Sequence, residues 1–428
     1  MRVWLLLLVC AAYANTLLAG FQFDDFRVIA GNPAVHRLRS WWLAAPHGIR
    51  PLLSLSYALN WSLAPYPVSF HLVNGLIHAM NVLLVHRLAC RHLGPGPGSF
   101  FAAALFALHP VQTEAVSYVC GRSVSLGAMG CLLAIESREW PRTGWILSPL
   151  FFLAALLVRE TALVLPLALL LWDRLGGRSW AESWRRVVPH AILAAAAAAV
   201  PFLQGGYRQF FESSLGLRPV LANLCTQVEG LGYLASRLVL PWRLNIDPDL
   251  RPLQQADGWH LLGVLLLLAL GVAALLRFRP GRADWAFAIL WCLLWLLPTN
   301  SVFPRRDVAS ERHLYLAITG FCLMAGGLVD GVLARFPVQR KPALLSALAL
   351  ILALGGMTVM RNRAYTTEVT LWEDTIRKSP YKARPHNNLG YAYEREGRAI
   401  EARREYQRAL DLDPHYDLAR RNLQRLAP

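Results

Sequence analysis

The amino-acid sequence predicts an all-α fold: a polytopic bundle of transmembrane helices followed by a short C-terminal helical domain. Apolar residues make up 55% of the 428-residue chain and charged residues only 16%, a balance that few soluble proteins of this length have. The apolar residues form runs long enough to cross a bilayer as helices. After Met360 the composition changes from leucine and alanine to a charged, amphipathic pattern. We therefore divide the chain into a membrane domain, residues 1–360, and a helical domain, residues 361–428.

Basic residues predict the orientation of the membrane domain. Five short loops between apolar runs are basic, and in chain order they contain Arg87 and Arg91; Arg138 and Arg142; Arg174, Arg178, Arg185 and Arg186; Arg277, Arg279 and Arg282; and Arg335, Arg340 and Lys341. Such loops stay in the cytoplasm. Because much of the net charge of +16 lies in them, it does not indicate a nucleic-acid-binding surface. The runs between these loops predict about 11 spans, with the N-terminus inside and residues 361–428 outside.

The first apolar run, Val3 to Gly20, is interpreted as a transmembrane helix. It could pass for a signal peptide, but no clear small-x-small cleavage site follows it. The next segment, Gly20 to Pro33, places Asp24 and Asp25 side by side, within about one helical turn of the membrane surface. Carboxylates so placed are costly unless they perform chemistry or bind a cation. A turn that only ends the first helix is the alternative.

The second span, about residues 68–86, carries a polar stripe. Its members are His71, Asn74, His78 and Asn81, spaced three or four residues apart on an otherwise apolar helix. Inside a bilayer such a stripe must face protein or water. Hydrogen bonding between helices is the favoured interpretation, and direct contact with a ligand is the alternative.

The third span begins near Ser99 and is broken at Pro110, so His109 and Glu114 are expected near the outer membrane surface. The remaining spans are expected at about 123–135, 144–158, 161–172, 187–203, 261–276, 285–297, 314–332 and 343–359. Residues 221–240 are long enough to cross but carry several polar side chains. If they crossed, the later basic loops would lie outside, so we expect a re-entrant or interfacial segment.

The C-terminal domain contains a tetratricopeptide repeat at residues 383–416. The residues at the diagnostic offsets of this 34-residue unit are Leu389, Gly390, Tyr393, Gly397, Ala402, Tyr406, Ala409 and Pro414. Residues 371–380 resemble the second helix of a preceding unit, and residues 417–426 the first helix of a following one. Such a short array must bury its seam against a neighbour, either the membrane domain or a partner.

The predicted topology collects charged side chains from separate loops on one outer face. These are Asp24, Asp25, His109, Glu114, Arg122, Arg159, Glu160, Glu311 and Arg312. Transfer from a lipid-linked donor needs guanidinium groups to stabilise the leaving phosphate and a carboxylate to take the proton of the acceptor hydroxyl. Ion pairs that only tie helices together would give the same pattern.

Several motifs occur in an order that resembles a known family. They are Phe23-Asp24-Asp25 with Gly31-Asn32-Pro33, Arg50-Pro51-Leu52, His71-Leu72-Val73-Asn74, His109-Pro110-Val111 with Thr113-Glu114-Ala115-Val116, Gly121-Arg122, Arg159-Glu160, Glu311-Arg312 with Leu314-Tyr315-Leu316, and the terminal repeat. Together they resemble the transmembrane and tetratricopeptide-repeat O-mannosyltransferases and their bacterial relatives, in the glycosyltransferase C superfamily.

This resemblance implies an integral membrane enzyme, in a bacterial inner membrane, whose site and repeats face away from the cytoplasm. Its donor would be a polyprenyl-phosphate sugar, usually mannose, and its acceptor a serine or threonine hydroxyl of a protein. The acidic pair and Glu114 would be catalytic, with Asp25 favoured as the base. Arg122, Arg159 and Arg312 would bind the donor phosphate. His109, Glu160, Glu311 and His78 would support the site.

The sequence departs from the family pattern at two positions and leaves other interpretations open. Gln112 stands where relatives often have a second histidine, and Val124 where an acidic residue is frequent. A non-catalytic scaffold, with the repeat binding an envelope protein, is the main rival function. A transporter would use the polar stripe, but paired halves with broken helices are not visible. No cofactor is firmly expected; the adjacent aspartates could hold a divalent metal with water or phosphate.

Overall fold

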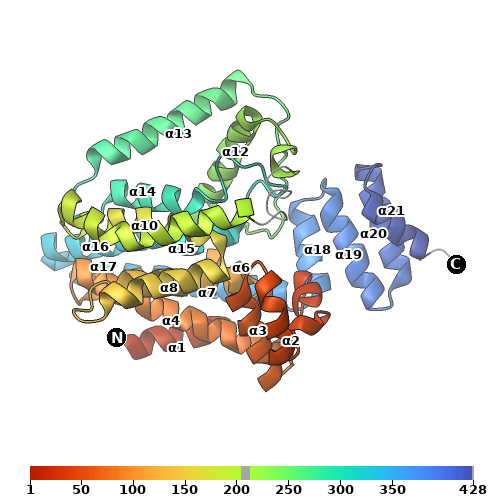
Figure 1. Ribbon diagram of the computed structural model, residues 1–428, viewed down its shortest axis with the longest axis horizontal. Helices are drawn as coiled ribbons and strands as arrows, with labels where there is room; N and C mark the ends of the chain where they lie inside the picture. Colours follow the sequence, from red (N-terminus) through yellow and green to blue (C-terminus); the bar gives the residue numbers. More distant parts are fainter. Residues whose placement is uncertain (204–212, 427–428) are drawn as a thin grey trace.

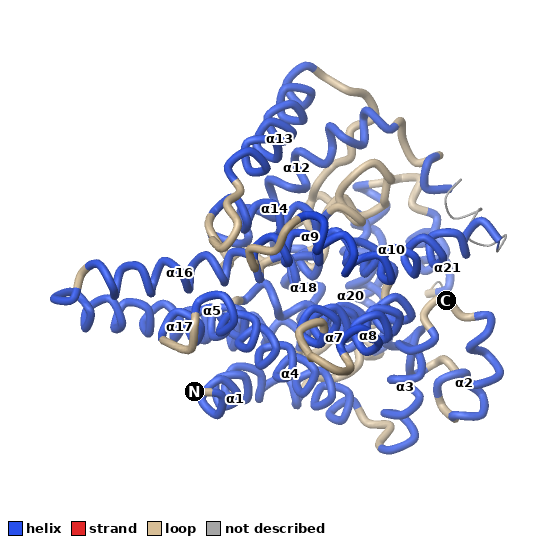
Figure 2. The backbone as a smooth tube through the Cα atoms, turned by 60° about the vertical axis from the view of Figure 1, so that its left-hand side comes forward, coloured by secondary structure: helices blue, strands red, loops and turns tan. Residues whose placement is uncertain are grey.

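The computed structural model describes residues 1–203 and 213–426, which form helices joined by loops (Figures 1 and 2). No β-strand occurs in these two ranges, so the predicted all-α fold is confirmed. Within these two ranges, four helices are long and apolar enough to cross a membrane, or five if one bent pair of helices is a single span. Shorter apolar helices accompany them, and the number of about 11 spans stays a prediction.

The N-terminal half of the membrane domain begins with two helices on either side of the acidic turn and continues as packed hairpins. Its helices are α1 (Arg2–Tyr13), α2 (Leu38–Ala44), α3 (Pro51–Leu63), α4 (Pro67–Leu93), α5 (Pro97–Leu108), α6 (Thr113–Val116), α7 (Arg122–Ser137), α8 (Gly144–Val158) and α9 (Leu165–Leu175). Helix α5 ends at Leu108 because Pro110, two residues on, has no N–H to continue the helical hydrogen bonds. The chain therefore turns there, as predicted.

The second half continues with α10 (Trp180–Leu203), α12 (Val220–Val239), α13 (Gly258–Arg277), α14 (Trp285–Leu296), α15 (Leu314–Ala317), α16 (Thr319–Arg335) and α17 (Arg340–Asn362). Helices α15 and α16 are bent by 51° at Ile318. Both flanks of α12 contact the segment before α15. Arg218, which precedes α12, donates to the Arg305 carbonyl, and the backbone N–H of Asn245, which follows α12, donates to Glu311. Both flanks of α12 thus contact one loop, the segment between α14 and α15, and a re-entrant or interfacial placement of α12 stays a prediction.

The five basic loops meet at one end of the bundle. Contacts between successive loops are Arg87 and Arg91 with Glu136, Arg138 with Asp173, Arg178 and Arg186 with Glu139, and the Gly281 N–H with the Leu175 carbonyl. The Gly98 N–H donates to Asp330 and so joins the first loop to the last. In Figure 1 this end lies to the left, with the N-terminus, whereas α2, α3, α6 and α18 lie to the right. The left end is the one that the positive-inside rule predicts to face the cytoplasm, and that sidedness stays a prediction.

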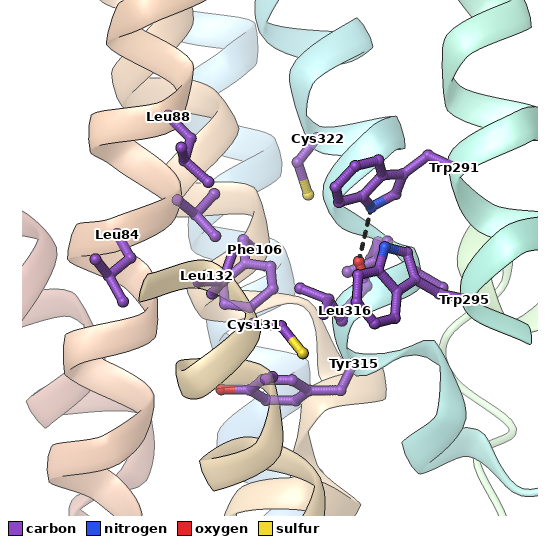
Figure 3. Close-up of a cluster of buried hydrophobic side chains, with 14 of the residues drawn as sticks. Leu84, Leu88, Phe106, Cys131, Leu132, Trp291, Trp295, Tyr315, Leu316 and Cys322 are labelled. Carbon is purple, nitrogen blue, oxygen red and sulfur yellow. Dashed lines mark hydrogen bonds between the residues drawn. The ribbon is translucent and has the colours of Figure 1, made fainter. Parts of the chain in front are cut away.

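The apolar core joins α4, α5, α7, α14 and α16, and Figure 3 shows part of it. Phe106 and Leu132 are fully buried between these helices, and the Trp291 indole N–H donates to the Leu316 carbonyl at 3.1 Å. Close approach of α5 and α16 requires Gly98, since a Cβ atom there would lie 2.3 Å from the Gly326 carbonyl oxygen. Close packing of this kind fixes the helix positions to within a fraction of an ångström.

Three members of the polar stripe of α4, Asn74, His78 and Asn81, bond to neighbouring segments. His78 lies between the Tyr315 hydroxyl, 2.8 Å away, and the Ala107 carbonyl, 3.0 Å away. Asn81 donates to Tyr315 and to the Ser125 carbonyl. These contacts fit the favoured interpretation, in which the stripe joins helices. His78 itself ties α4 to α5 and α15 and lies away from both cavities described below.

Helices α18 (Glu368–Lys378), α19 (Ala383–Arg395), α20 (Ala399–Leu412) and α21 (Asp417–Arg425) form a stack at the right of Figure 1. The predicted repeat is the α19–α20 pair, in which Gly390 lets the Tyr406 ring approach and Gly397, with φ of 76°, makes the turn. Helices α18 and α21 are the two predicted half units. The stack packs against the membrane domain through α18, so its seam is buried within the chain.

We expect Asp173→Asn to lower the free energy of unfolding by about 3–5 kcal/mol, because it breaks a buried ion pair. Asp173 is fully buried and lies 2.8 Å from the guanidinium of Arg138, which is 3% exposed. Chemical denaturation in detergent micelles measures the change. The control is Glu182→Ala, which removes a half-exposed partner of Arg178 and should change stability by less than about 0.5 kcal/mol. Equal stability of both variants would contradict the prediction.

Candidate active site

The acidic turn, residues 20–26, lies between the membrane domain and α18. Phe23 adopts a positive φ of 45°, which a bulky residue rarely does, so its surroundings must hold it. Its backbone N–H donates to Glu368, and its ring packs edge-on against Trp372 at 5.1 Å. The Gly20 N–H also donates to the Thr366 carbonyl. The first repeat helix therefore holds the turn that presents Asp24 and Asp25.

Asp25 is 1% exposed and points into the protein. Its carboxylate accepts the Gln22 N–H at 3.0 Å and the Cys120 N–H at 2.8 Å. Burial raises the pKa of Asp25 to about 7, although these two hydrogen bonds lower it, and the charge of Asp24 adds to the rise. Asp25 thus ties the turn after α1 to the segment before α7, and its charge changes near neutral pH.

Asp24 points the other way, into a cavity of about 190 Å³ that we call the polar cavity. The cavity is lined by Phe23, Asp24, Glu114, Tyr118, Ile246, Asp247, Pro248, Asp307, Val308, Ala309, Ser310, Arg312, Trp372, Lys382 and Arg384. The Asp24 side chain is 37% exposed and lies 3.5 Å from the exposed guanidinium of Arg27. Its backbone N–H donates to the Tyr118 hydroxyl at 3.1 Å. Of the two aspartates, Asp24 is the one that a molecule in the cavity would meet.

Glu114 and Arg312 form one part of the wall that the membrane domain contributes to the polar cavity. The Glu114 carboxylate accepts the Ser310 hydroxyl at 3.1 Å and the Arg312 N–H at 3.0 Å, and lies 3.5 Å from the Arg312 Nε. Burial raises the pKa of Glu114 above its usual value, even though Arg312 and these hydrogen bonds lower it. Glu114 thus orients the arginine as well as facing the cavity.

Arg312 also lines a second cavity of about 40 Å³, which we call the apolar slot. Its other lining residues are Val124, Gly127, Ala128, Cys131, Arg159, Thr161, Ala162, Trp295, Thr299, His313 and Leu316. Arg312 is the residue that both linings share. The Arg312 guanidinium therefore lies between the apolar slot within the bundle and the polar cavity at its end.

Arg159 is buried and lines the apolar slot together with Arg312. In the described part of the chain its guanidinium donates to the hydroxyls of Thr161 and Ser123 and forms no ion pair. Glu160, the nearest acid in sequence, pairs instead with Arg50 through two hydrogen bonds of 2.9 and 2.8 Å. Burial lowers the pKa of Arg159 well below its usual value, and the charges of Arg50 and Arg312 add to this. An anion placed here would relieve that repulsion.

Arg122 has a different setting from the other two predicted phosphate ligands. It is fully buried, and it donates to Asn74 at 2.7 Å, to Asn60 at 2.8 Å, and to backbone carbonyls of α3 and α4. Neither cavity is lined by it. The role of Arg122 as a phosphate ligand stays a prediction. Its hydrogen bonds indicate instead that Arg122 holds α3, α4 and α7 together beneath the acidic turn.

The two remaining predicted site residues hold the end of α12. His109 contacts the Leu238 carbonyl at 3.1 Å, and Glu311 accepts the Tyr233 hydroxyl and the Asn245 N–H. Both are nearly fully buried and line neither cavity. Sequence reasoning missed Asp247, Asp307, Lys382, Arg384 and Trp372, which do line the polar cavity. No local pattern marks them, because each reaches the site through folding.

A divalent metal finds little support from the acidic pair. Asp24 faces the polar cavity while Asp25 turns away from it and accepts two backbone N–H groups, so the carboxylates do not converge on one point. Within residues 1–203 and 213–426 no group of three or more His, Cys, Asp or Glu side chains is arranged to hold a metal ion. The described residues therefore do not fit a cation bound by both aspartates.

The fold and the site together define a class: a polytopic helical membrane protein whose repeat domain covers a charged cavity at one end of the bundle. Comparison with known proteins shows which proteins of this class the chain is similar to. The chain is 26% identical to the protein O-mannosyl-transferase F38B6.6 of Caenorhabditis elegans, over 95% of this chain and 61% of the relative. It is 26% identical to Tmtc3 of Drosophila melanogaster, over 98% and 57%, and 25% identical to TMTC3 of Mus musculus, over 95% and 50%. Both of these are also named protein O-mannosyl-transferases.

The resemblance expected from the motifs is therefore confirmed, and the chain spans between half and three fifths of the length of these relatives. The family model for the tetratricopeptide repeat matches residues 383–416, the range predicted from the sequence. No solved structure matches the chain.

We expect Gly121→Ala to destabilise the protein by about 1–3 kcal/mol and to disturb the site, because the added methyl group overpacks it. A Cβ atom at this position would lie 2.3 Å from the Glu114 carbonyl oxygen and 3.0 Å from the Ala115 backbone. Thermal unfolding in detergent measures the loss. Gly75→Ala is the matched control, since nothing lies within 4 Å of its Cβ position in α4. A Gly121→Ala protein as stable as this control would refute the prediction.

Proposed function

We propose that this protein transfers a sugar, mannose by analogy with its named relatives, from a polyprenyl-phosphate donor to serine or threonine hydroxyls of proteins. The observation that carries the proposal is the polar cavity, in which Asp24 and Glu114 face the same space as Arg312. An acceptor hydroxyl needs a carboxylate, and a phosphate leaving group needs a cation. The positive-inside rule supports a site on the extracytoplasmic side, in a bacterial inner membrane as the sequence resemblance implies.

The proposed reaction is a displacement at the anomeric carbon of the donor sugar. A carboxylate takes the proton of the acceptor hydroxyl, and the hydroxyl oxygen forms a bond to the anomeric carbon. The bond from that carbon to the phosphate oxygen breaks, and its electron pair leaves with the polyprenyl phosphate. Guanidinium groups stabilise the charge that develops on this phosphate.

Asp24 is the carboxylate that we propose as the base. The resemblance implied by the sequence favours Asp25 as the base, and that assignment stays a prediction. A base must come within hydrogen-bond reach of the proton that it takes. Asp24 lines the cavity, whereas Asp25 is 1% exposed and is engaged with two backbone N–H groups. These surroundings support Asp25 as the residue that positions the turn and Asp24 as the residue that meets the hydroxyl.

Arg312 and Arg159 are the proposed donor-phosphate ligands. Arg312 lies between the apolar slot and the polar cavity, and Arg159 lines the slot, where its partners in the described part of the chain are two hydroxyls. A lipid phosphate bound there would direct its first isoprene units into the slot and its sugar into the cavity. Glu160 takes part indirectly, since its two hydrogen bonds to Arg50 hold a further guanidinium near this region.

A non-catalytic scaffold is the second candidate function. The repeat supports it, because stacked helical repeats present concave surfaces that bind other proteins. The buried acids and unpaired guanidinium at the cavity weigh against it, since burying charge is costly and a scaffold has no use for it. Purified protein incubated with polyprenyl-phosphate mannose and serine- or threonine-containing peptides decides between them: product peptide supports the enzyme, and its absence with every donor supports the scaffold.

We expect Asp24→Asn to lower kcat by about 10²- to 10⁴-fold, the usual effect of losing a general base. The protein should remain folded, because the side chain is partly exposed and its one ion pair, with Arg27, lies at the surface. Transfer to a peptide acceptor measures kcat. Asp24→Ala should regain part of its activity with added formate, whereas Asp25→Ala should not, because formate cannot reach the buried position. Rescue of Asp25→Ala alone would return the base to Asp25.

We expect Arg312→Ala to raise the KM for the donor by at least about tenfold, because it removes a charge-assisted contact to the phosphate. Arg312→Lys should recover part of this, since lysine keeps the charge but not the forked geometry. Initial rates at varied donor concentration measure KM. The control is Arg363→Ala, an exposed arginine near the same end of the bundle, which should leave the donor KM unchanged. An unaltered donor KM in Arg312→Ala would remove this arginine from the phosphate site.

A further inference from the structure

The repeat domain forms part of the polar cavity rather than hanging beside it. Trp372 on α18, Lys382 before α19 and Arg384 in its first turn all line the cavity, opposite Glu114 and Arg312. No described residue of the repeat domain lines the apolar slot. The repeat domain therefore contributes to the polar cavity alone, and not to the slot proposed for the lipid.

Arg384 bridges two loops of the membrane domain. Its Nε lies 2.7 Å from Asp247 Oδ2, its second terminal nitrogen bonds Asp247 Oδ1, and the remaining nitrogen lies 2.6 Å from Asp307 Oδ1. The guanidinium thus uses all three nitrogens on two carboxylates that are 60 residues apart in sequence. Bidentate pairs of this kind fix direction as well as distance.

The neighbours of Arg384 hold the first of these loops, residues 244–248, at further points. Lys382 lies 2.5 Å from Asp247 and 2.9 Å from the Pro248 carbonyl. Ser379 donates to the Asp247 carbonyl, and Lys378 donates to the Leu244 carbonyl. The loop therefore has the conformation that residues 378–384 impose on it.

We propose that Arg384 is a positioning residue for the acceptor: by bridging Asp247 and Asp307 it holds the wall of the polar cavity against which the peptide around the acceptor hydroxyl lies. This inference rests on the proposed transferase function. A sugar can fit within the cavity, but a peptide must extend beyond it, and Trp372, Lys382 and Arg384 place the repeat stack next to the cavity. Helical repeats present the kind of surface along which an extended peptide can bind.

The kinetic test separates acceptor binding from donor binding and from chemistry. Arg384→Ala should raise the KM for a serine- and threonine-containing peptide about tenfold, because loops released from their bridge misplace the wall. The donor KM and the kcat at saturating peptide should stay within about twofold. Arg384→Lys should show an intermediate acceptor KM, since lysine cannot bridge both carboxylates. Arg403→Ala, an exposed arginine on α20, is the control and should match the unmodified protein.

Two readouts do not depend on sugar transfer. A zero-length carbodiimide should join Lys382 to Asp247 in the unmodified protein, and mass spectrometry of its peptides should detect this pair. A fluorescent acceptor peptide should bind Arg384→Ala about tenfold more weakly than the unmodified protein in the absence of donor. If the unmodified protein transfers no sugar, the proposed function fails. The cross-link and the peptide-binding measurement still test whether Arg384 and Lys382 hold the cavity wall and whether a peptide binds there.

An unchanged acceptor KM and unchanged peptide binding in Arg384→Ala would overturn the proposal. So would a change confined to donor KM or to kcat, since it would assign Arg384 to the donor or to the chemistry. Absence of the Lys382–Asp247 cross-link would show that the repeat domain does not form this wall in solution.

Discussion

The Asp25 carboxylate is the contact on which the geometry of the candidate site depends. It accepts N–H groups from Gln22 and from Cys120, two segments almost 100 residues apart, and so fixes the turn after α1 against the start of α7. The neighbouring Asp24 is thereby directed into the polar cavity. Burial raises the pKa of Asp25 to about 7, so ionising this carboxyl in the folded protein costs folding free energy as the pH rises toward 7, and the two N–H donors offset part of that cost.

The arginines of the protein fall into two physical groups. At the basic end, Arg138 is neutralised by Asp173, and such a pair holds helices without leaving a field to attract a ligand. Near the cavity, the partners of Arg159 within the described residues are hydroxyls, and Arg312 lies 3.5 Å from Glu114, with the charges of Asp307 and Asp24 also acting on it. Uncompensated positive charge in a low-dielectric pocket attracts anions strongly. The distribution of acids, rather than the number of arginines, therefore indicates where a phosphate would bind.

The acidic turn and the repeat domain stabilise one another. Phe23 adopts an unfavourable φ that Glu368 and Trp372 hold, and the same helix leads into the residues that bridge Asp247 and Asp307. A repeat stack too short to bury its own seam thus gains an apolar neighbour, and the membrane domain gains one wall of its cavity. The two domains distinguished by composition are a single structural unit at this end of the molecule.

The sequence by itself determined the helical class, the positions of most apolar helices and the repeat at 383–416, because apolar periodicity and repeat offsets are local properties. It also selected Asp24, Glu114 and Arg312, which do meet. Only the tertiary structure decided which of two adjacent aspartates faces the cavity, that Arg122 is enclosed by amides and carbonyls, and that Lys382 and Arg384 reach the site. These depend on contacts between residues far apart in the chain, and a local pattern contains no information about such contacts.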